Sequence, residues 1–334
     1  MIDLSLIWIV IIALGVLIYV ILDGFDLGIG ILFPFIKDGQ ERDVMMNTVA
    51  PVWDGNETWM VMGGAGLFAA FPLVYSTVLS ALYLPIILMV IALIFRGVAF
   101  EFRFKANRTK QLWDQAFIWG SILGSFFQGV ILGAYIQGIQ TTNGVYSGGG
   151  FDWLTPFSLF TGVGVVVLYA TLGCGWLIFK TEKQLQDKMY AFMPKLIISL
   201  LFIFGAVSIY TPLVHEEIAL RWFSQPQIFY FSPVPILVFL FIFLALRACK
   251  RRQEFAPFIY VLALVILAYT GFLISVWPYI IPPSITIWQA AAPASSQLFA
   301  LIGALILIPI ILFYTALSYW VFRDKVRIGD DGYH

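Results

Sequence analysis

The chain has 334 residues, of which 61% are hydrophobic and only 11% are charged, and its 19 basic and 19 acidic side chains leave no net charge. Soluble domains carry about 25% charged residues, so this composition cannot cover a water-facing surface. The lack of a basic excess argues against a nucleic-acid partner, because nothing is available to neutralise phosphates. We therefore expect a multi-pass integral membrane protein whose surface is largely solvated by lipid.

Nine stretches are apolar enough and roughly long enough to cross a bilayer as helices, which takes about 20 residues each. The first is long for one straight crossing, and Asp23-Gly24 marks a point where it could bend or break. The charged stretch Lys180–Lys195 could form a short surface helix. In chain order the predicted spans are Leu4–Phe33, Asp54–Leu73, Leu79–Phe100, Ala116–Gln137, Pro156–Phe179, Leu196–Pro212, Pro233–Leu246, Phe258–Trp277 and Leu298–Phe322.

The basic residues predict the orientation of these spans. If the amino terminus lies outside, 17 of the 19 Lys and Arg side chains fall in inner segments, whereas only Arg221 falls in an outer loop and Arg96 lies within a span. Inner loops of membrane proteins carry such an excess. We therefore expect a periplasmic amino terminus, a cytoplasmic carboxyl terminus and an odd number of spans. The connecting loops are short, so the whole of 1–334 is predicted to be one membrane domain.

The residues that usually hold redox metals are scarce. His215 and His334 are the only histidines, and Cys174 and Cys249 form no metal-binding motif. Two histidines on facing helices, the common way to hold a haem within a membrane bundle, are therefore excluded. We expect no haem and no metal on this chain, so that any redox cofactor would belong to a partner.

Two acid pairs lie inside predicted spans. Asp23 and Asp26 are three residues apart near the inner end of the first span, and Asp54 and Glu57 have the same spacing at the inner start of the second. Side chains spaced in this way share one helix face. An ionisable residue within a span costs on the order of 2.5–3.5 kcal/mol and is a functional hypothesis by default.

A single basic residue, Arg96, lies near the inner end of the third span, five residues before Glu101. The predicted topology brings Arg96 to the same cytoplasmic depth as the four acids. Four carboxylates around one guanidinium cannot all be ionised cheaply in a low dielectric, so we expect some of them to exchange protons. This arrangement predicts a proton intake from the cytoplasm.

A purely structural interpretation of the same residues remains open. Trp53 and Trp59 could be interfacial belt residues, and Asp54 could cap the second helix with Glu57 completing a capping box. Asp23 and Arg96 could form an ion pair with no role beyond stability. Asp114, Asp152, Glu216 and Glu217 are expected to be ordinary loop or interface residues.

Five blocks of residues, spread from the first span to the last, form a recognisable set. They are Asp23-Gly24-Phe25-Asp26-Leu27-Gly28, Ala50-Pro51-x-Trp53-Asp54-Gly55-Asn56-Glu57-x-Trp59, Phe95-Arg96 followed by Glu101-Phe102-Arg103, Trp288-x-Ala290 leading to Ser295-Ser296-Gln297-Leu298, and Tyr314-Thr315-Ala316-x-x-Tyr319-Trp320. In these blocks the chain resembles subunit II of the cytochrome bd-type quinol oxidases. Its short loops look closer to the cyanide-insensitive branch of that family.

The resemblance implies an all-α membrane protein of nine transmembrane helices. They would form two four-helix bundles, at 1–137 and 156–281, and one peripheral helix at 298–322. It also implies a bacterial inner-membrane complex with a haem-bearing subunit I, which carries haems b and d. A small single-helix accessory subunit and a structural ubiquinone are further possibilities. The complex would oxidise ubiquinol and reduce dioxygen to water.

The resemblance also assigns roles to single residues. Asp26 and Asp54 match positions implicated in a proton path from the cytoplasm, and Trp53 and Arg96 match neighbours of that path. We take Asp23 and Glu57 as further members of the pathway, with Asn56 and Glu101 in support.

Two other functions remain open from the sequence. The rival is a proton-coupled secondary transporter, whose acids would line a substrate path. Transporters usually place such groups near the bilayer midplane, with broken helices in both repeats, whereas here they gather at one face of one half. The third candidate is a scaffold with no proton role.

Overall fold

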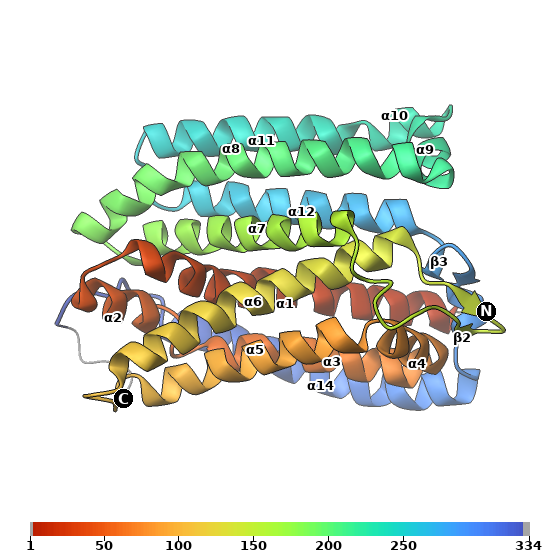
Figure 1. Cartoon of the computed structure of the whole chain (residues 1–334), viewed down its shortest axis with the longest axis horizontal. Helices are drawn as coiled ribbons and strands as arrows, with labels where there is room; N and C mark the ends of the chain where they lie inside the picture. Colours follow the sequence, from red (N-terminus) through yellow and green to blue (C-terminus); the bar gives the residue numbers. More distant parts are fainter. Residues whose placement is uncertain (1–2, 330–334) are drawn as a thin grey trace.

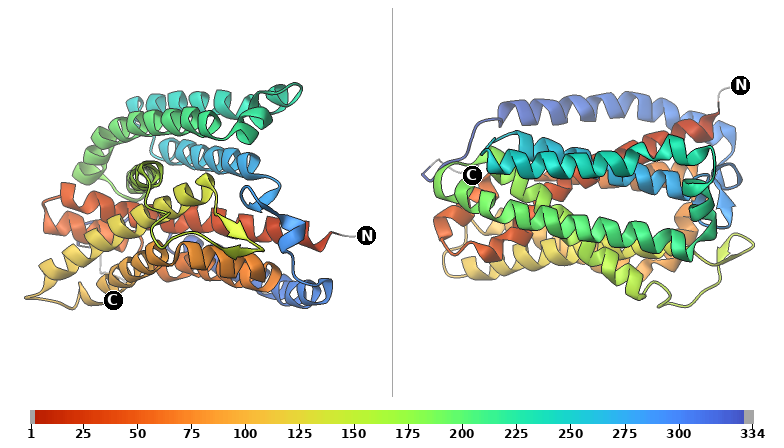
Figure 2. Two further views of the ribbon diagram at one scale, coloured as in Figure 1. Left: turned by 45° about the vertical axis from the view of Figure 1, so that its right-hand side comes forward. Right: turned by 90° about the horizontal axis from the view of Figure 1, so that it is seen from above.

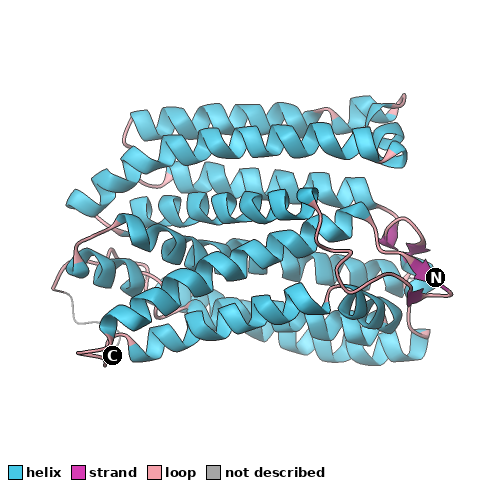
Figure 3. Ribbon diagram, in the orientation of Figure 1, coloured by secondary structure: helices cyan, strands magenta, loops and turns pink. Residues whose placement is uncertain are grey.

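The computed structural model describes residues 3–329, which fold almost entirely into helices that run along one long axis (Figures 1 and 3). Within that range, eight helices are long and apolar enough to cross a membrane, and a bent helix pair raises the number to nine. The start of α1 and the end of α14 lie at opposite ends of the long axis (Figure 1).

The bounds of most long helices agree with the predicted spans within a few residues. The helices that correspond to single predicted spans are α1 (Leu4–Leu32), α5 (Tyr83–Phe102), α6 (Lys110–Gln137), α7 (Pro156–Lys180), α8 (Lys183–Val214), α11 (Pro233–Lys250), α12 (Ala256–Val276) and α14 (Ala294–Val321). Asp23-Gly24, where the sequence allowed a bend or a break, does not break the helix, because α1 is continuous through both residues and ends in a single 3-10 turn, Phe33–Phe35. A glycine inside a helix costs only about 1 kcal/mol relative to alanine, and packing against α7 compensates for it.

The second predicted span is the one that differs most. Helix α3 (Trp53–Ala70) stops before Phe71, and α4 (Pro72–Ala81) leaves it at an angle of 120°. Pro72 lacks the backbone N–H that would continue the α3 ladder, so it starts a new helix. The predicted span Asp54–Leu73 therefore ends too late, and Leu79 belongs to α4 rather than to the third span.

The remaining elements are short and lie at the helix ends. Helix α2 (Gly39–Asn47) follows α1, while α9 (Glu216–Phe223) and α10 (Gln227–Phe231) lead from α8 to α11. Two hairpins, β1–β2 (Thr141–Thr142 with Val145–Tyr146) and β3–β4 (Tyr279–Ile281 with Ile285–Thr286), are followed in the chain by α7 and by α13 (Ile287–Ala290), respectively. The surface helix expected at Lys180–Lys195 is wrong, because Lys183–Lys195 are the first turns of α8 and Pro194 lies within that helix.

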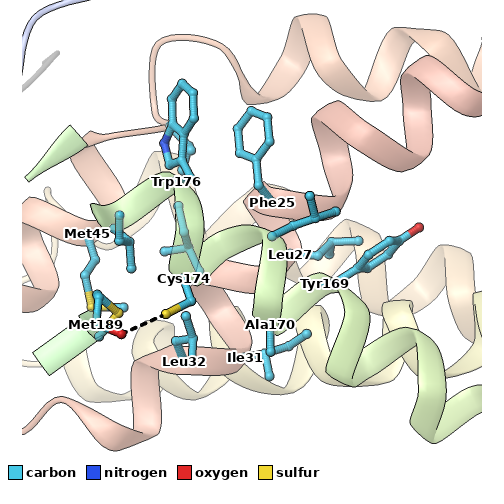
Figure 4. Packing of buried hydrophobic residues seen from close by; sticks show 14 of the residues in the cluster. Phe25, Leu27, Ile31, Leu32, Met45, Tyr169, Ala170, Cys174, Trp176 and Met189 are labelled. Carbon is cyan, nitrogen blue, oxygen red and sulfur yellow. Dashed lines mark hydrogen bonds between the residues drawn. The ribbon is translucent and has the colours of Figure 1, made fainter. Parts of the chain in front are cut away.

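Helix α1 is the centre of the packing, with α3, α6, α7 and α14 around it. The α1–α7 contact is a backbone contact, since a Cβ at Gly28 would lie 2.7 Å from the carbonyl carbon of Tyr169 and 2.8 Å from the nitrogen of Gly173. Phe25 stacks on Trp176 at 4.4 Å between ring centroids (Figure 4). Helix α14 runs along one edge of the molecule beside α3 and α1 (Figure 2).

Candidate functional site

The site is built around a buried ion pair between α1 and α5. Arg96 Nη2 donates a hydrogen bond to Asp23 Oδ1, and both side chains are 0% exposed. Glu57 on α3 places its Oε2 3.7 Å from the same nitrogen, and its side chain is 25% exposed. Three of the five residues predicted from the sequence are therefore brought together at one point.

Close packing around Arg96 explains why its charge stays away from solvent. A Cβ at Gly120 of α6 would lie 2.8 Å from the Arg96 backbone nitrogen, so the glycine lets α5 and α6 approach closely. The guanidinium carbon lies 5.8 Å from the Trp53 ring centroid and 5.9 Å from that of Phe100. These two rings stack on each other at 5.1 Å, and an aromatic face attracts a desolvated cation.

Asp26 belongs to a separate chain of hydrogen bonds that crosses from α1 to α14. Its Oδ2 accepts a hydrogen bond of 2.8 Å from Asn56 Nδ2, and the Tyr319 hydroxyl donates one of 2.8 Å to Asn56 Oδ1. Asp26 is 0% exposed, and within residues 3–329 its Oδ1 has no hydrogen-bond partner. This carboxyl is therefore held by an amide and not by a countercharge.

A cavity of about 400 Å³ reaches this chain from the surface. Its charged lining residues are Asp54 and Glu101, and it extends to Asn56 and Tyr319. Asp54 and Glu101 are both exposed, and Glu101 pairs with Lys105 at 3.8 Å. The cavity thus connects an acidic surface with the amide that holds Asp26.

Two of the structural interpretations of the acidic motif are wrong. Val52 is the N-cap of α3 and Asp54 lies inside the helix, so Asp54 and Glu57 form no capping box. Trp59 is 1% exposed, so the belt interpretation is wrong for it. Trp53 is partly exposed and packs on Phe100, and its place in a belt stays a prediction. The belt and cap interpretations used local sequence only, whereas the α3 start is set by the turn that precedes it.

Tyr319 is a site residue that the sequence reasoning missed as such. It lies in a motif quoted for the family resemblance, but 263 positions separate it from Asn56 in the chain. Only the packing of α14 on α3 brings the two together.

Asp114, which the sequence suggested was an ordinary loop or interface residue, belongs to a buried network of ion pairs. Instead of lying in a loop, it is 7% exposed and binds Arg103 and Arg42 through its two oxygens. This network ties α2 to the end of α5 and to the first turns of α6, because Arg103 also binds Asp43.

Few side chains of the kind that bind metals come together in the part of the chain that the structure describes. Among residues 3–329, no group of three or more His, Cys, Asp or Glu side chains could hold a metal ion. His215, the one histidine in that range, lies at the junction of α8 and α9, and His334 lies outside the described residues.

Comparisons with known proteins agree over nearly the whole chain. The family model for cytochrome bd terminal oxidase subunit II matches residues 4–322. Cytochrome bd-I ubiquinol oxidase subunit 2 of Escherichia coli K12 is 30% identical, with 98% of this chain and 96% of that protein covered. Cytochrome bd ubiquinol oxidase subunit 2 of Bacillus subtilis is 29% identical, with 96% of each covered.

The fold is similar to that of a solved structure as well. A chain of the bd oxidase from Geobacillus thermodenitrificans superimposes with a TM-score of 0.80 over 96% of this chain and 98% of that one. The sequence identity is 17%, so this likeness supports the fold alone.

Proposed function

This chain belongs to the cytochrome bd terminal oxidase subunit II family, and is thus a subunit of an oxidoreductase; we propose that it is the non-haem subunit of a quinol oxidase and lines the path by which protons enter the enzyme. The complex would oxidise ubiquinol and reduce dioxygen to water. The haem-bearing subunit I would hold haems b and d, which supply the electron transfer, and the present chain would stabilise that partner.

The proposal includes the placement of the chain in a bacterial inner membrane. The basic side chains favour a periplasmic amino terminus and a cytoplasmic carboxyl terminus. Helices α1, α3–α4, α5 and α6 would form one bundle, α7, α8, α11 and α12 the other, with α14 as the peripheral helix. A small accessory subunit and a structural ubiquinone belong to the same proposal.

The observation that carries the proton role is the continuity between the cavity and Asp26. Asp54 and Glu101 attract protons to the cavity mouth, and Asn56 and Tyr319 line its inner part. Asn56 in turn holds Asp26, which is fully buried. A proton would pass from the acidic mouth through water in the cavity to the neighbourhood of Asp26.

The two buried aspartates, Asp23 and Asp26, have different surroundings, and we therefore give them different roles in the proposed pathway. Asp23 faces the guanidinium of Arg96, so its negative charge is compensated where it stands. Asp26 faces an uncharged amide, and a buried carboxylate without a countercharge is costly. Asp26 is therefore the acid that takes up and releases the proton.

Purification of the complex tests this function. We expect the chain to co-elute with a second large polypeptide and with haem absorbance, whereas a colourless, stable single chain would favour the transporter. In the assembled complex, Asp54→Asn should lower quinol-driven oxygen consumption at unchanged haem content. Asp187→Asn, at an exposed inner-surface acid that pairs with Arg252, is the matched control. Full activity of the Asp54 variant would leave only the scaffold role.

A further inference from the structure

A second cavity, of about 350 Å³, lies between the ends of α6, α8 and α12 and the β3–β4 hairpin. Helix α9 and strand β3, which border it, lie at the same end of the long axis as the start of α1 (Figure 1). The proton route described above does not reach this cavity. Its volume is within the range of sites that bind small molecules, about 300–1,000 Å³.

The cavity lies at the depth of lipid headgroups. Helices α8 and α12 end at Val214 and Val276, and both residues line the cavity. A span ends where the hydrocarbon core gives way to the polar headgroups. Large aromatic side chains are exposed at the same end of the molecule, since Trp277 is 45% and Tyr230 72% exposed. Belts of Trp and Tyr are typical of this interface.

Charges of both signs line this cavity without binding each other. Glu216 and Glu217 begin α9, and Arg221 follows one turn after Glu217. An acid and a base with this spacing on a helix often pair, but within residues 3–329 none of the three side chains forms an ion pair. Arg221 Nη1 donates one long hydrogen bond, of 3.4 Å, to the Ile274 carbonyl. The guanidinium and both carboxylates therefore remain available to a ligand.

The balance of these charges selects the kind of ligand. Burial lowers the pKa of His215, which also lines the cavity, so this side chain adds no positive charge at pH 7 and the lining carries two negative charges and one positive. Free phosphate would meet two carboxylates, and a simple cation would leave Arg221 without a partner. A headgroup with a phosphate next to a primary ammonium satisfies all three, because arginine binds phosphate through paired hydrogen bonds and an ammonium donates three.

An apolar track for acyl chains leads away from the cavity along α8. Phe202, Ile209 and Leu213 are spaced seven and four residues apart and therefore share one helix face. Their exposed fractions are 72%, 65% and 80%. Leu213 precedes Val214, which lines the cavity and is itself 51% exposed. A molecule with its headgroup in the cavity can therefore lay its chains on this face of α8.

We propose that this cavity binds the headgroup of a phosphatidylethanolamine molecule, with its phosphate on Arg221 and its ammonium group on Glu216 and Glu217. Under the orientation proposed above, the lipid belongs to the outer leaflet. Phosphatidylcholine has the same charges, but its quaternary ammonium donates no hydrogen bond, so it binds more weakly. The inference requires only that the chain spans a membrane and is independent of the proton route.

The test measures lipid binding to the assembled, haem-containing complex by native mass spectrometry. Delipidated complex is titrated with phosphatidylethanolamine and, separately, with phosphatidylcholine and phosphatidylglycerol of the same acyl chains. The test variants are Arg221→Met and the double change Glu216→Gln with Glu217→Gln. Arg252→Met and Asp187→Asn are the matched controls, because they remove exposed charges near the other end of α8. Arg221→Lys keeps the positive charge and separates its loss from a loss of packing.

We expect wild type to hold one phosphatidylethanolamine more tightly than either other lipid. Both test variants should bind it about ten-fold more weakly, as expected for the loss of a hydrogen bond to a charged group, whereas the controls should match wild type and Arg221→Lys should lose less than Arg221→Met. Equal affinity for the three lipids, or test variants that bind like the controls, would overturn the proposal. Weakening by Arg221→Met alone would describe an anion site and would also overturn it, as would a quinone that wild type retains and Arg221→Met loses.

Discussion

The buried pair of Arg96 and Asp23 should be the most sensitive electrostatic contact in the chain. Arg96→Met leaves Asp23 as a charge that is 0% exposed and has no counterion. Removing one partner of a buried ion pair costs about 3–5 kcal/mol. Glu57 loses the same partner, but its side chain is 25% exposed, so water solvates it at little cost. At about 2 °C per kcal/mol for a large domain, the thermal midpoint should fall by about 6–10 °C.

The assay is the temperature at which haem absorbance is lost from the purified complex. Asp23→Asn combined with Arg96→Met should recover most of the loss, because replacing a whole buried pair by uncharged groups is often nearly neutral. Arg252→Met is the control, since Arg252 and Asp187 are 65% and 53% exposed and such surface pairs contribute at most about 1 kcal/mol. If Arg96→Met were no less stable than Arg252→Met, the buried pair would not hold the site together.

Three further changes test the packing and the route. Gly28→Ala should destabilise the complex, because its Cβ would overlap the Tyr169 carbonyl. Gly205→Ala is the control: a Cβ there meets no atom within 4 Å, so the change should stabilise the complex by about 0.5–1 kcal/mol. Equal thermal midpoints of the two variants would refute the backbone contact at Gly28. Lys180→Met should loosen the end of α14, since Lys180 Nζ donates to the Phe322 and Asp324 carbonyls, and faster proteolysis after residue 322 measures this; an unchanged cleavage rate would argue against the anchor. Tyr319→Phe removes the donor to Asn56 and should slow oxygen consumption about two- to ten-fold, in line with one hydrogen bond, at intact haem content; wild-type turnover would exclude this hydroxyl from the route.

Much of the architecture could be predicted because lipid imposes a simple rule. A span needs about 20 apolar residues, and eight of the nine predicted spans each correspond to one helix that is long and apolar enough to cross a membrane by itself. The exception was the second, where the apolar run continues through Phe71 and Pro72 although the helix axis turns by 120°. A hydropathy pattern does not reveal such a turn. Pro72 was the residue in the sequence that indicated it.

The sequence predicts which charged residues belong to the site, but not which of them bind each other. Charge within apolar segments identified Asp23, Asp26, Glu57 and Arg96, and the structure places the two aspartates on α1 with Arg96 between Asp23 and Glu57. Asp23 binds the guanidinium of Arg96, whereas Asp26 binds the amide of Asn56. Which partner each aspartate takes depends on the side-chain rotamers and on the position of Asn56. Neither the rotamers nor the position of Asn56 can be inferred from the spacing of the residues in the sequence.

The same limit applies to polar residues without charge. Gln128 accepts a hydrogen bond from the Tyr169 hydroxyl, although both sit in apolar helices among residues that ordinarily fill membrane cores and are 41 positions apart. Their partnership follows from the crossing of α6 and α7, which sequence patterns alone do not define.

Proton consumption at the inner face of the reconstituted oxidase is the most direct measurement of the whole account. Liposomes that contain the complex, with a pH-sensitive dye in contact with the cytoplasmic face, report proton uptake during quinol-driven oxygen reduction. Asp26→Asn should slow uptake and turnover together by at least about ten-fold with normal haem content, while Asp187→Asn should match wild type. Unchanged proton uptake in the Asp26 variant would contradict the claim that protons enter through this chain.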